Sequence, residues 1–509
     1  MKNTVYKNAS VVTGLSVAER GLGFLYRIVL SRLIGAEGLG LYQVALSLFS
    51  LFLTIGTGGL PITLSRILTK SKAEHHARDG ESATAAGFCL ALILTLPAAV
   101  FLLLFGERLH FLFSDHRTFR VFRILLLGLS LSAVYAVIRG YFWSEKEFLL
   151  PSILEIAEES VMVIVGVLIL QRIDSPAMGA ERAAWAVVIS YLFSFTASLV
   201  CFFVKGGKLS SPKKQLKPLF TATMPITSVR ASGSLVNSAV AVLLPLMLVR
   251  SGMTNSEATA LFGIVSGMVL PLLFVPSTLI GSLSLVLVPE LAEDYYKHNE
   301  ERLLKNVERG LRFAFLVACA LIPIFFALGK ELGQLAFSNE TAGELLVKSS
   351  IILLPMSLTM ISTSMLNSMG FEKQTFIFYF LGAAALLLSV LLLPSICGIY
   401  AYVIGLLASF LVTAICNLVC LRRHCPFFGQ NFKKVCLRRF LPILLALLPL
   451  SLLGQLLSIA LGKFFGAFLA PTLTFLCLSI AILLLFNFTR QIDFWGIFRK
   501  FSRKKRQKR

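Results

Sequence analysis

The feature that most constrains this chain is the length of its apolar stretches. A helix needs ~20 mostly apolar residues to cross the ~30 Å hydrocarbon core of a membrane. The sequence contains fourteen stretches of about that length. They are continuous, whereas the strands of a membrane β-barrel alternate polar and apolar residues over about ten positions. The sequence therefore predicts an all-α polytopic membrane protein with 14 transmembrane helices. The predicted spans lie near 10–31, 41–64, 84–105, 121–143, 151–170, 183–204, 219–249, 259–288, 312–328, 349–368, 374–394, 399–421, 440–461 and 466–488.

The distribution of positive charge predicts the orientation of these spans. Apolar residues make up 56% of the 509 residues and charged residues 15%, yet the formal net charge is +22. Of the 48 Lys and Arg residues, 33 fall in the loops on the side of the two termini, 11 on the other side and 4 within spans. Because Lys and Arg concentrate in cytoplasmic loops, we expect both termini to be cytoplasmic.

Two parts of the chain resemble each other and indicate an internal duplication. The second predicted span begins with Leu41-Tyr42-Gln43 and ends at Pro61, and the eighth begins with Leu261-Phe262-Gly263 and ends at Pro289. An even number of spans separates them, which predicts two six-helix lobes related by a pseudo-two-fold axis along the membrane normal. The predicted parts are an N-terminal lobe (1–204), a basic linker (205–218), a C-terminal lobe (219–421), two further helices (440–488) and a polybasic cytoplasmic tail (489–509).

Charged residues inside the predicted spans are the candidates for function. A charge at mid-bilayer costs ~2.5–3.5 kcal/mol on insertion scales, so its presence suggests a role. Arg20 and Arg27 lie two helical turns apart, as do Arg230 and Asn237, so each pair shares a helix face. The remaining charged positions within the spans are Glu19, Arg139, Glu155, Glu158 and Glu159.

These residues allow two interpretations. They can form structural ion pairs that tie helices together, with the glutamates neutralising the arginines. Alternatively, Arg20, Arg27 and Arg230, with Asn237, line a water-filled cavity and bind an anionic headgroup such as a phosphate or diphosphate, which the planar guanidinium binds in bidentate fashion. The other charged residues within the spans are then candidates for ion pairing or for coupling to an ion: Glu19, Arg139, Glu155, Glu158 and Glu159.

Helix-breaking residues within the spans predict bends. Pro225 in the seventh span, and Pro271 and Pro276 in the eighth, interrupt the backbone hydrogen-bond ladder. In a transporter such residues act as hinges for alternating access.

No pattern in the sequence indicates soluble catalysis, a metal or a cofactor. The sequence lacks a phosphate-binding Gly-Lys-Ser/Thr loop, and the spacing of Cys416, Cys420, Cys425 and Cys436 matches no zinc site. We therefore expect a non-enzyme without cofactor or metal. The basic tail follows a final span, which favours anionic membrane lipids over nucleic acid as its partner.

Two motifs carry a resemblance to a known family. The stretch from Gly23 to Ile28, followed by Ser31 to Gln43, resembles the stage V sporulation protein B group of polysaccharide transporters. The run from Phe262 to Pro276, ending at Leu287-Val288-Pro289-Glu290, is similar to the eighth-span signature of that group. With fourteen spans, the whole chain resembles the multidrug/oligosaccharidyl-lipid/polysaccharide exporter superfamily.

The resemblance implies a flippase of the bacterial cytoplasmic membrane for undecaprenyl-diphosphate-linked peptidoglycan or polysaccharide precursors, with two six-span lobes around a central cavity. In the related lipid II flippases, arginines of the first span line this cavity. Arg20 matches one of them in register with Gly35, and Arg27 lies one residue beyond the position of another, where this sequence has Tyr26. The expected partners are the lipid-linked substrate and, at the inner surface, cell-wall synthesis enzymes, with a monomer as the oligomeric state.

Two other functions compete with this one. A cation-coupled multidrug antiporter of the same superfamily would need an acidic, aromatic cavity, whereas the first and seventh spans carry arginines. A non-transporting membrane scaffold that recruits cell-wall enzymes would tolerate the loss of every charge within the spans.

Overall fold

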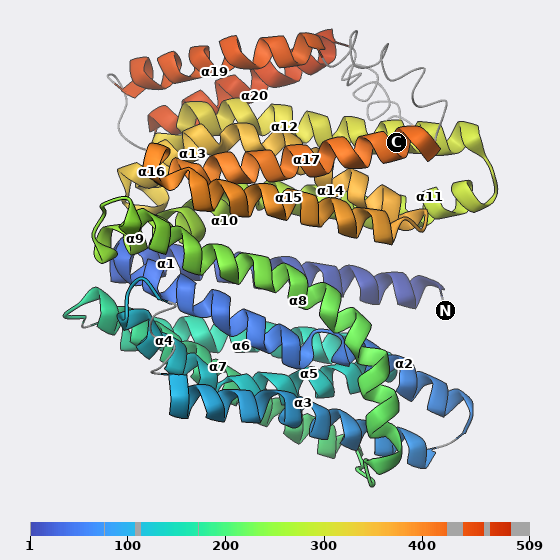
Figure 1. Cartoon of the computed structure of the whole chain (residues 1–509). Helices are drawn as coiled ribbons and strands as arrows, with labels where there is room; N and C mark the ends of the chain where they lie inside the picture. The colour runs from blue at the N-terminus through green and yellow to red at the C-terminus, as the bar shows by residue number, and fades with distance from the viewer. Residues whose placement is uncertain are drawn as a thin grey trace, which may run out of the picture. The chain divides into compact units, whose positions relative to one another are not determined.

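The structure is a computed structural model, and it describes residues 2–75, 77–106, 113–171, 173–424, 441–462 and 469–489. Within these ranges the chain consists of helices and connecting turns and contains no strand (Figure 1). The predicted all-α class is therefore confirmed. Cys425, Cys436 and the basic tail from residue 490 lie outside the described residues.

The chain divides into two compact units. Unit 1 comprises residues 1–268 and 390–399, and unit 2 comprises 269–389 and 400–509. The predicted lobe boundary at 205–218 stays a prediction; these residues form the end of a turn, a short loop and the first residues of a helix.

The helices of unit 1 run from α1 to α9, with the short α16 added from later in the chain. Their bounds are α1 (Lys2–Thr57), α2 (Leu60–Ala73), α3 (Ala77–Phe105), α4 (Arg117–Leu127), α5 (Leu129–Ser144), α6 (Leu149–Ile169), α7 (Pro176–Val204), α8 (Lys213–Arg250), α9 (Asn255–Gly263) and α16 (Pro394–Cys397).

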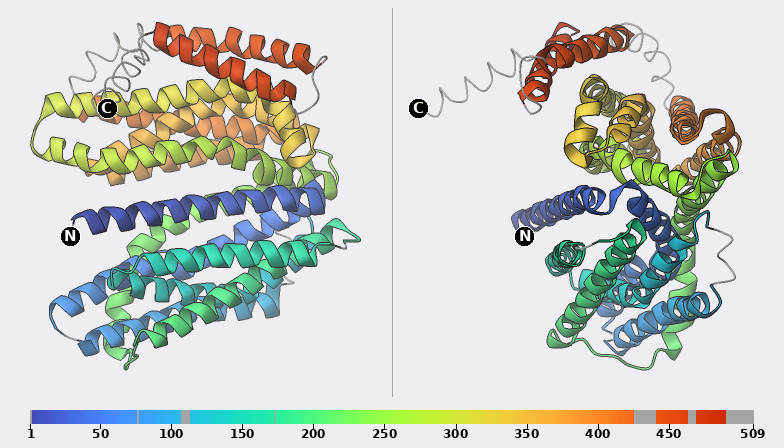
Figure 2. Two further views of the ribbon diagram at one scale, coloured as in Figure 1. Left: turned by 180° about the vertical axis from the view of Figure 1, so that it is seen from behind. Right: turned by 90° about the vertical axis from the view of Figure 1, so that its left-hand side faces the viewer.

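The helices of unit 2 form a second bundle. The π-helical segment η2 (Ile264–Val269) leads into it, and α19 and α20 lie side by side in Figure 2, with α19 also packed against α12. The bounds are α10 (Leu270–Leu273), α11 (Val275–Tyr296), α12 (Glu300–Phe337), α13 (Glu340–Ser349), η3 (Ser350–Ile352), α14 (Leu353–Ser368), α15 (Glu372–Leu392), α17 (Tyr400–His424), α19 (Leu441–Gly462) and α20 (Leu469–Phe488).

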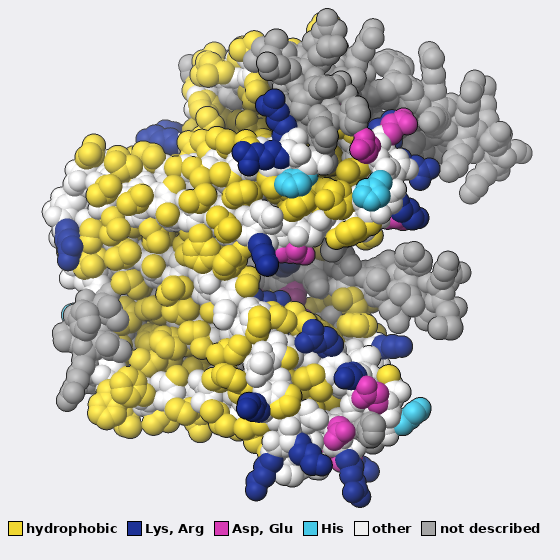
Figure 3. All heavy atoms as spheres, turned by 45° about the vertical axis from the view of Figure 1, so that its right-hand side comes forward, with side chains coloured by type: hydrophobic (Ala, Val, Ile, Leu, Met, Phe, Trp, Pro, Cys, Tyr) yellow, Lys and Arg dark blue, Asp and Glu magenta, His cyan; other side chains and the backbone are white. Residues whose placement is uncertain are grey.

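The described helices identify a multi-pass membrane protein. Twelve of them are long and apolar enough to cross a membrane, or thirteen if the bent pair α4–α5 is one span. Hydrophobic side chains cover most of the surface seen in Figure 3, as expected for helices that face lipid. The count of fourteen stays a prediction.

The first helix is two helices joined at Gly35. This residue has φ +71°, the left-handed region in which an L side chain is strained, so glycine is the residue best suited to the kink. The chain reverses at this kink without a loop (Figure 1), so α1 contains the first predicted span and most of the second, whose last residues lie in α2.

Prolines mark breaks in two other places. α8 contains Pro218, Pro225 and Pro245 and bends along its length in Figure 1. The region predicted as one span at 259–288 is instead divided into α9, η2, α10 and α11, with Pro271 in the first turn of α10 and Pro276 in the first turn of α11. Proline fits a first helical turn because the amide there has no intrahelical acceptor.

Glycines allow α1 and α9 to cross at close range. A Cβ atom on Gly40 would overlap the carbonyl oxygen of Thr259, and a Cβ on Gly263 would lie 2.5 Å from the amide nitrogen of Gly40. The two motifs that carried the family resemblance thus pack against each other, backbone to backbone.

We predict that Gly40→Ala or Gly263→Ala destabilises the protein by about 1–3 kcal/mol, because the added methyl group forces the two backbones apart. Thermal unfolding of the purified protein in detergent would measure this loss. Gly14→Ala is the control, since a Cβ at Gly14 meets no atom within 4 Å. Equal unfolding midpoints for all three variants would contradict the close crossing.

Candidate functional site

Most of the charged residues predicted to lie within the spans come from α1, α5 and α6 of unit 1, whereas Arg230 lies on α8. Glu19 of α1 interacts electrostatically with Glu155 of α6 and with Arg139 of α5. α1 packs against α5, α6 and α7, which are therefore the helices that surround these charges. The structure thus assembles one charged group from three separate stretches of sequence.

Arg139 and Glu155 form a direct ion pair. Arg139 Nη1 donates to Glu155 Oε1 at 2.8 Å, and the guanidinium also lies over the rings of Trp143 and Tyr135, at 5.3 Å and 5.9 Å from their centroids. Both charged side chains are largely buried, with exposed fractions of 30% and 23%. This contact matches the structural interpretation: Arg139 ties α5 to α6.

The other two glutamates of α6 face different helices. Glu158 lies near Ser194 of α7, whose hydroxyl donates to the carbonyl of Tyr191 at 3.2 Å. Glu159 faces α1, where a Cβ on Gly23 would lie 2.8 Å from Glu159 Oε1. Glu159 also interacts electrostatically with Glu19 and Arg27.

The three candidate binding arginines differ from Arg139 because they lack direct partners. Arg20 is exposed, Arg27 is half-buried and Arg230 is exposed. With the other residues that the structure describes, none of the three forms a hydrogen bond or an ion pair. These guanidinium groups have their donors available for a ligand.

Arg230 and Asn237 are exposed on α8, and small polar residues on the adjoining strip of the same helix attach it to α1 and α2. The hydroxyls of Thr54 and Ser234 lie 2.9 Å apart, and Ser238 Oγ donates to the carbonyl of Ser47 at 2.7 Å. The Gly59 amide, just before α2, donates to Thr227 Oγ1 at 3.0 Å. Arg230 and Asn237 are thus exposed at the edge of the contact between α8 and α1.

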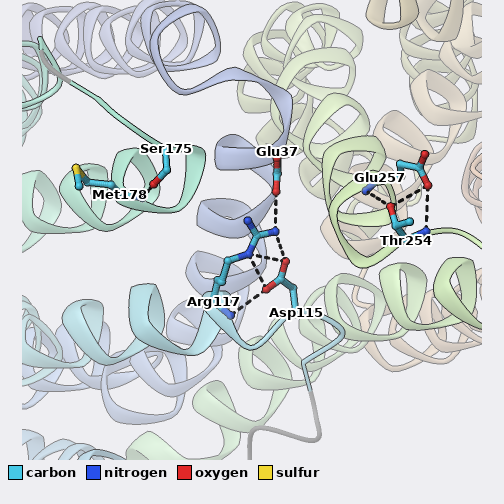
Figure 4. A network of polar contacts seen from close by, with 7 residues as sticks. All are labelled: Glu37, Asp115, Arg117, Ser175, Met178, Thr254 and Glu257. Atoms are coloured by element: carbon cyan, nitrogen blue, oxygen red, sulfur yellow. Dashed lines mark hydrogen bonds and ion pairs between the residues drawn. The ribbon is translucent and has the colours of Figure 1, made fainter.

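A second charged group lies beside the kink of α1. Figure 4 shows Arg117, the first residue of α4, between Glu37 and Asp115. Arg117 Nη2 donates to Glu37 Oε1 at 2.6 Å and to Asp115 Oδ2 at 2.5 Å, and the Arg117 amide donates to Asp115 Oδ1 at 2.9 Å. Burial alone would raise the pKa of the Asp115 carboxyl, but the hydrogen bonds from Arg117 outweigh it and lower this pKa.

Comparison with known proteins places the chain in a family. A family model described as polysaccharide biosynthesis protein matches residues 5–293, more than half of the chain. The chain belongs to the polysaccharide biosynthesis protein family. Stage V sporulation protein B of Bacillus subtilis is 26% identical over 355 residues, covering 67% of this chain and 68% of that protein. Lipid II flippase MurJ of Bacillus subtilis is 23% identical, covering 88% of this chain and 87% of that protein.

Solved structures share the fold of this family member. The inward closed conformation of lipid II flippase MurJ has a TM-score of 0.65 at 14% identity, covering 94% of this chain and 98% of the other. An inward-facing multidrug resistance MATE family transporter of the MOP superfamily also has a TM-score of 0.65, at 15% identity, covering 81% and 96%. The predicted relation to the stage V sporulation protein B group of polysaccharide transporters is therefore confirmed, and the fold is shared with a transporter of the exporter superfamily.

Two sets of contacts in this family member were not predicted from the sequence. Glu37, Asp115 and Arg117 lie between the predicted spans, and nothing local in the sequence indicates that a residue near position 37 meets residues near 115. The Asp115–Arg117 spacing at the start of a helix was a usable signal, since a carboxylate there caps backbone amides. The hydroxyls that join α1 to α8 gave no signal, because Ser and Thr are common throughout membrane helices.

We predict that the Arg139–Glu155 pair couples by about 1–2 kcal/mol, between the values for exposed and fully buried ion pairs. Arg139→Ala leaves Glu155 uncompensated in a membrane interior. The double variant with Glu155→Ala should therefore lose less free energy of unfolding than the two single variants lose together. Thermal unfolding of the four proteins gives the coupling. Additive losses would contradict a direct pair.

We predict a pH-dependent contribution from Asp115. Because its pKa is lowered in the folded protein, the ionised carboxyl stabilises the fold above its ordinary pKa of ~4, and this stabilisation is lost as pH falls through the lowered value. Asp115→Asn should lower the unfolding midpoint at pH 7, and the difference from the unmodified protein should vanish at the most acidic pH. Exposed Asp174→Asn is the control. A difference independent of pH would contradict the assignment.

Proposed function

We propose that this protein is a flippase that moves an undecaprenyl-diphosphate-linked peptidoglycan or polysaccharide precursor across the bacterial cytoplasmic membrane by alternating access, with both termini cytoplasmic. The observation that carries the proposal is that Arg20, Arg27 and Arg230 lie on membrane helices without a direct partner among the described residues. Family membership and the names of the relatives support the same class of cargo.

A diphosphate headgroup suits such arginines for chemical reasons. The guanidinium stays charged when it is desolvated, and its planar fork donates two parallel hydrogen bonds to a phosphate. Asn237, two turns along the same face of α8 as Arg230, adds a neutral donor and acceptor. Leaving three arginines unpaired in a membrane helix bundle is costly unless an anionic ligand neutralises them in part of the cycle.

The membrane potential favours export of this cargo. Moving one elementary charge through 100 mV changes the free energy by ~2.3 kcal/mol. A headgroup with about two negative charges therefore gains ~4–5 kcal/mol when it moves outward from an inside-negative cell. The empty, cationic site is driven inward by the same field, which supports a complete cycle without nucleotide hydrolysis.

A multidrug antiporter is the second candidate, and the fold shared with a MATE transporter favours it. A cationic drug needs free carboxylates. In this protein Glu155 is paired with Arg139, so fewer carboxylates are available than the sequence suggests. The balance of unpaired charge favours an anionic cargo.

Depletion of the protein tests the proposal. We predict that an undecaprenyl-diphosphate-linked saccharide accumulates in depleted cells, during growth or during sporulation, and that mass spectrometry of extracted lipids identifies it. Re-expression of the unmodified protein should clear the lipid. Each of Arg20→Ala, Arg27→Ala and Arg230→Ala should reduce clearance at least about tenfold, since a lost charge-assisted hydrogen bond costs ~1.5–3 kcal/mol.

Arg250→Ala is the matched control, because Arg250 is an exposed arginine in the last turn of the same helix as Arg230. It should clear the lipid as the unmodified protein does. All variants are compared at equal amounts in the membrane and with equal thermal stability. If no such lipid accumulates, or if all three alanine variants clear it normally, the proposed function is wrong.

A further inference from the structure

One face of α1 and one face of α6 carry a ladder of charges. Glu19, Gly23 and Arg27 follow one another at four-residue intervals on α1 and therefore share a face. Glu155 and Glu159 have the same spacing on α6. The small Gly23 lets Glu159 approach the α1 backbone, which places its carboxylate between Glu19 and Arg27 along the helix.

The two glutamates on this face of α6 differ in their contacts. Glu155 is held by Arg139 in a direct ion pair. Glu159 forms no ion pair or hydrogen bond with another described residue, and the attractive charge that acts on it is that of Arg27. Arg27 in turn has no direct partner, so the two side chains attract each other without closing a contact.

Glu159 is surrounded by charged side chains and tyrosine hydroxyls. Glu19, Tyr26 and Tyr42 interact with it from α1, Tyr191 from α7 and Glu158 from its own helix. Arg139 of α5 acts on Glu19, Glu155 and Glu158. Tyr42 interacts with both Arg27 and Glu159. The Tyr26 hydroxyl, in a side chain that is 2% exposed, has no hydrogen-bond partner.

We propose that Glu159 is an internal competitor for Arg27: its carboxylate balances Arg27 in the empty protein, and it gives up Arg27 and takes a proton when an anionic headgroup binds. This inference rests on the proposed function, because it assumes that Arg27 contacts the headgroup. Glu159 is a positioning residue, since it acts on the ligand through Arg27.

The physical reason is the crowding of negative charge. When a diphosphate occupies Arg27, the carboxylates of Glu19 and Glu159 lose the positive charge that stood between them and the ligand. Like charges within a few ångströms in a poorly solvated site favour protonation of one of them. A proton from solvent then neutralises Glu159, and it leaves again when the headgroup is released and the carboxylate recovers Arg27.

This competition makes ligand binding depend on pH. Binding that takes up one proton changes affinity by at most about tenfold per pH unit, with tighter binding at lower pH. Glu159→Gln removes the competing charge and keeps the shape of the side chain. The variant should therefore bind the headgroup about tenfold more tightly at pH 8 and lose most of the pH dependence.

The test uses full-length protein in detergent with undecaprenyl diphosphate as the probe. Calorimetric titration in two buffers of different ionisation enthalpy gives the protons taken up per bound ligand. The unmodified protein should take up more protons than Glu159→Gln, and this difference excludes the titration of the diphosphate itself. Glu74→Gln is the control: Glu74 is an exposed glutamate just after α2 that pairs with Lys70, so this variant should behave as the unmodified protein does.

Transport kinetics give a second readout that a merely structural role would not move. Because Glu159→Gln removes the group that helps to release the headgroup, its KM should fall and its kcat should fall with it. Glu159→Asp, which restores a carboxylate, should recover part of the kcat.

The possible outcomes separate this inference from the proposed function. If the unmodified protein does not bind the probe, or if Arg27→Ala binds it equally well, the proposed function is wrong. If Arg27→Ala loses binding but Glu159→Gln matches the unmodified protein in affinity, proton uptake and kinetics, the proposed function stands and the competitor role is wrong.

Discussion

The structure of unit 1 depends on which charged side chains in its membrane helices are paired and which are not. A charge in hydrocarbon is costly unless it is paired or hydrated. Arg139 meets this condition with Glu155 and two aromatic rings, and it thereby holds α5 against α6. Arg20, Arg27 and Arg230 do not meet it through direct contacts. The contrast between one paired arginine and three unpaired ones is the basis of the functional proposal.

Small residues determine where these charges can sit. Gly23 lets Glu159 reach the backbone of α1, and Gly166 lies against Tyr26, where a Cβ would be 2.7 Å from a ring carbon. Gly40 and Gly263 let α1 and α9 cross with their backbones in contact. Close helix approach through glycine is a general device in membrane proteins, because lipid supplies no hydrophobic force between helices. Here it also sets the spacing between charges on neighbouring helices.

Much of the fold followed from local sequence, and the pairing of charges did not. Long apolar runs predict spans directly, because the bilayer sets their length. The reversal at Gly35 and the break at Phe274 are harder to predict from the sequence, because each depends on one or two residues within a continuous apolar stretch. The spacing of Glu155, Glu158 and Glu159 puts them on one side of α6. The structure nevertheless places each beside a different neighbour: Arg139, Ser194 and the Gly23 position of α1. Partners of this kind depend on which helices pack together, and that information is not local.

The central claim is that unpaired intramembrane arginines select an anionic headgroup. The most direct measurement reconstitutes the protein in sealed vesicles and compares the transfer of two fluorescent polyprenyl glycolipids with the same sugar. One is linked through a diphosphate, and the other through an uncharged linker. We predict that the protein transfers the diphosphate-linked lipid and leaves the uncharged lipid at the rate of protein-free vesicles. Equal transfer of both lipids would contradict recognition of the headgroup by the arginines.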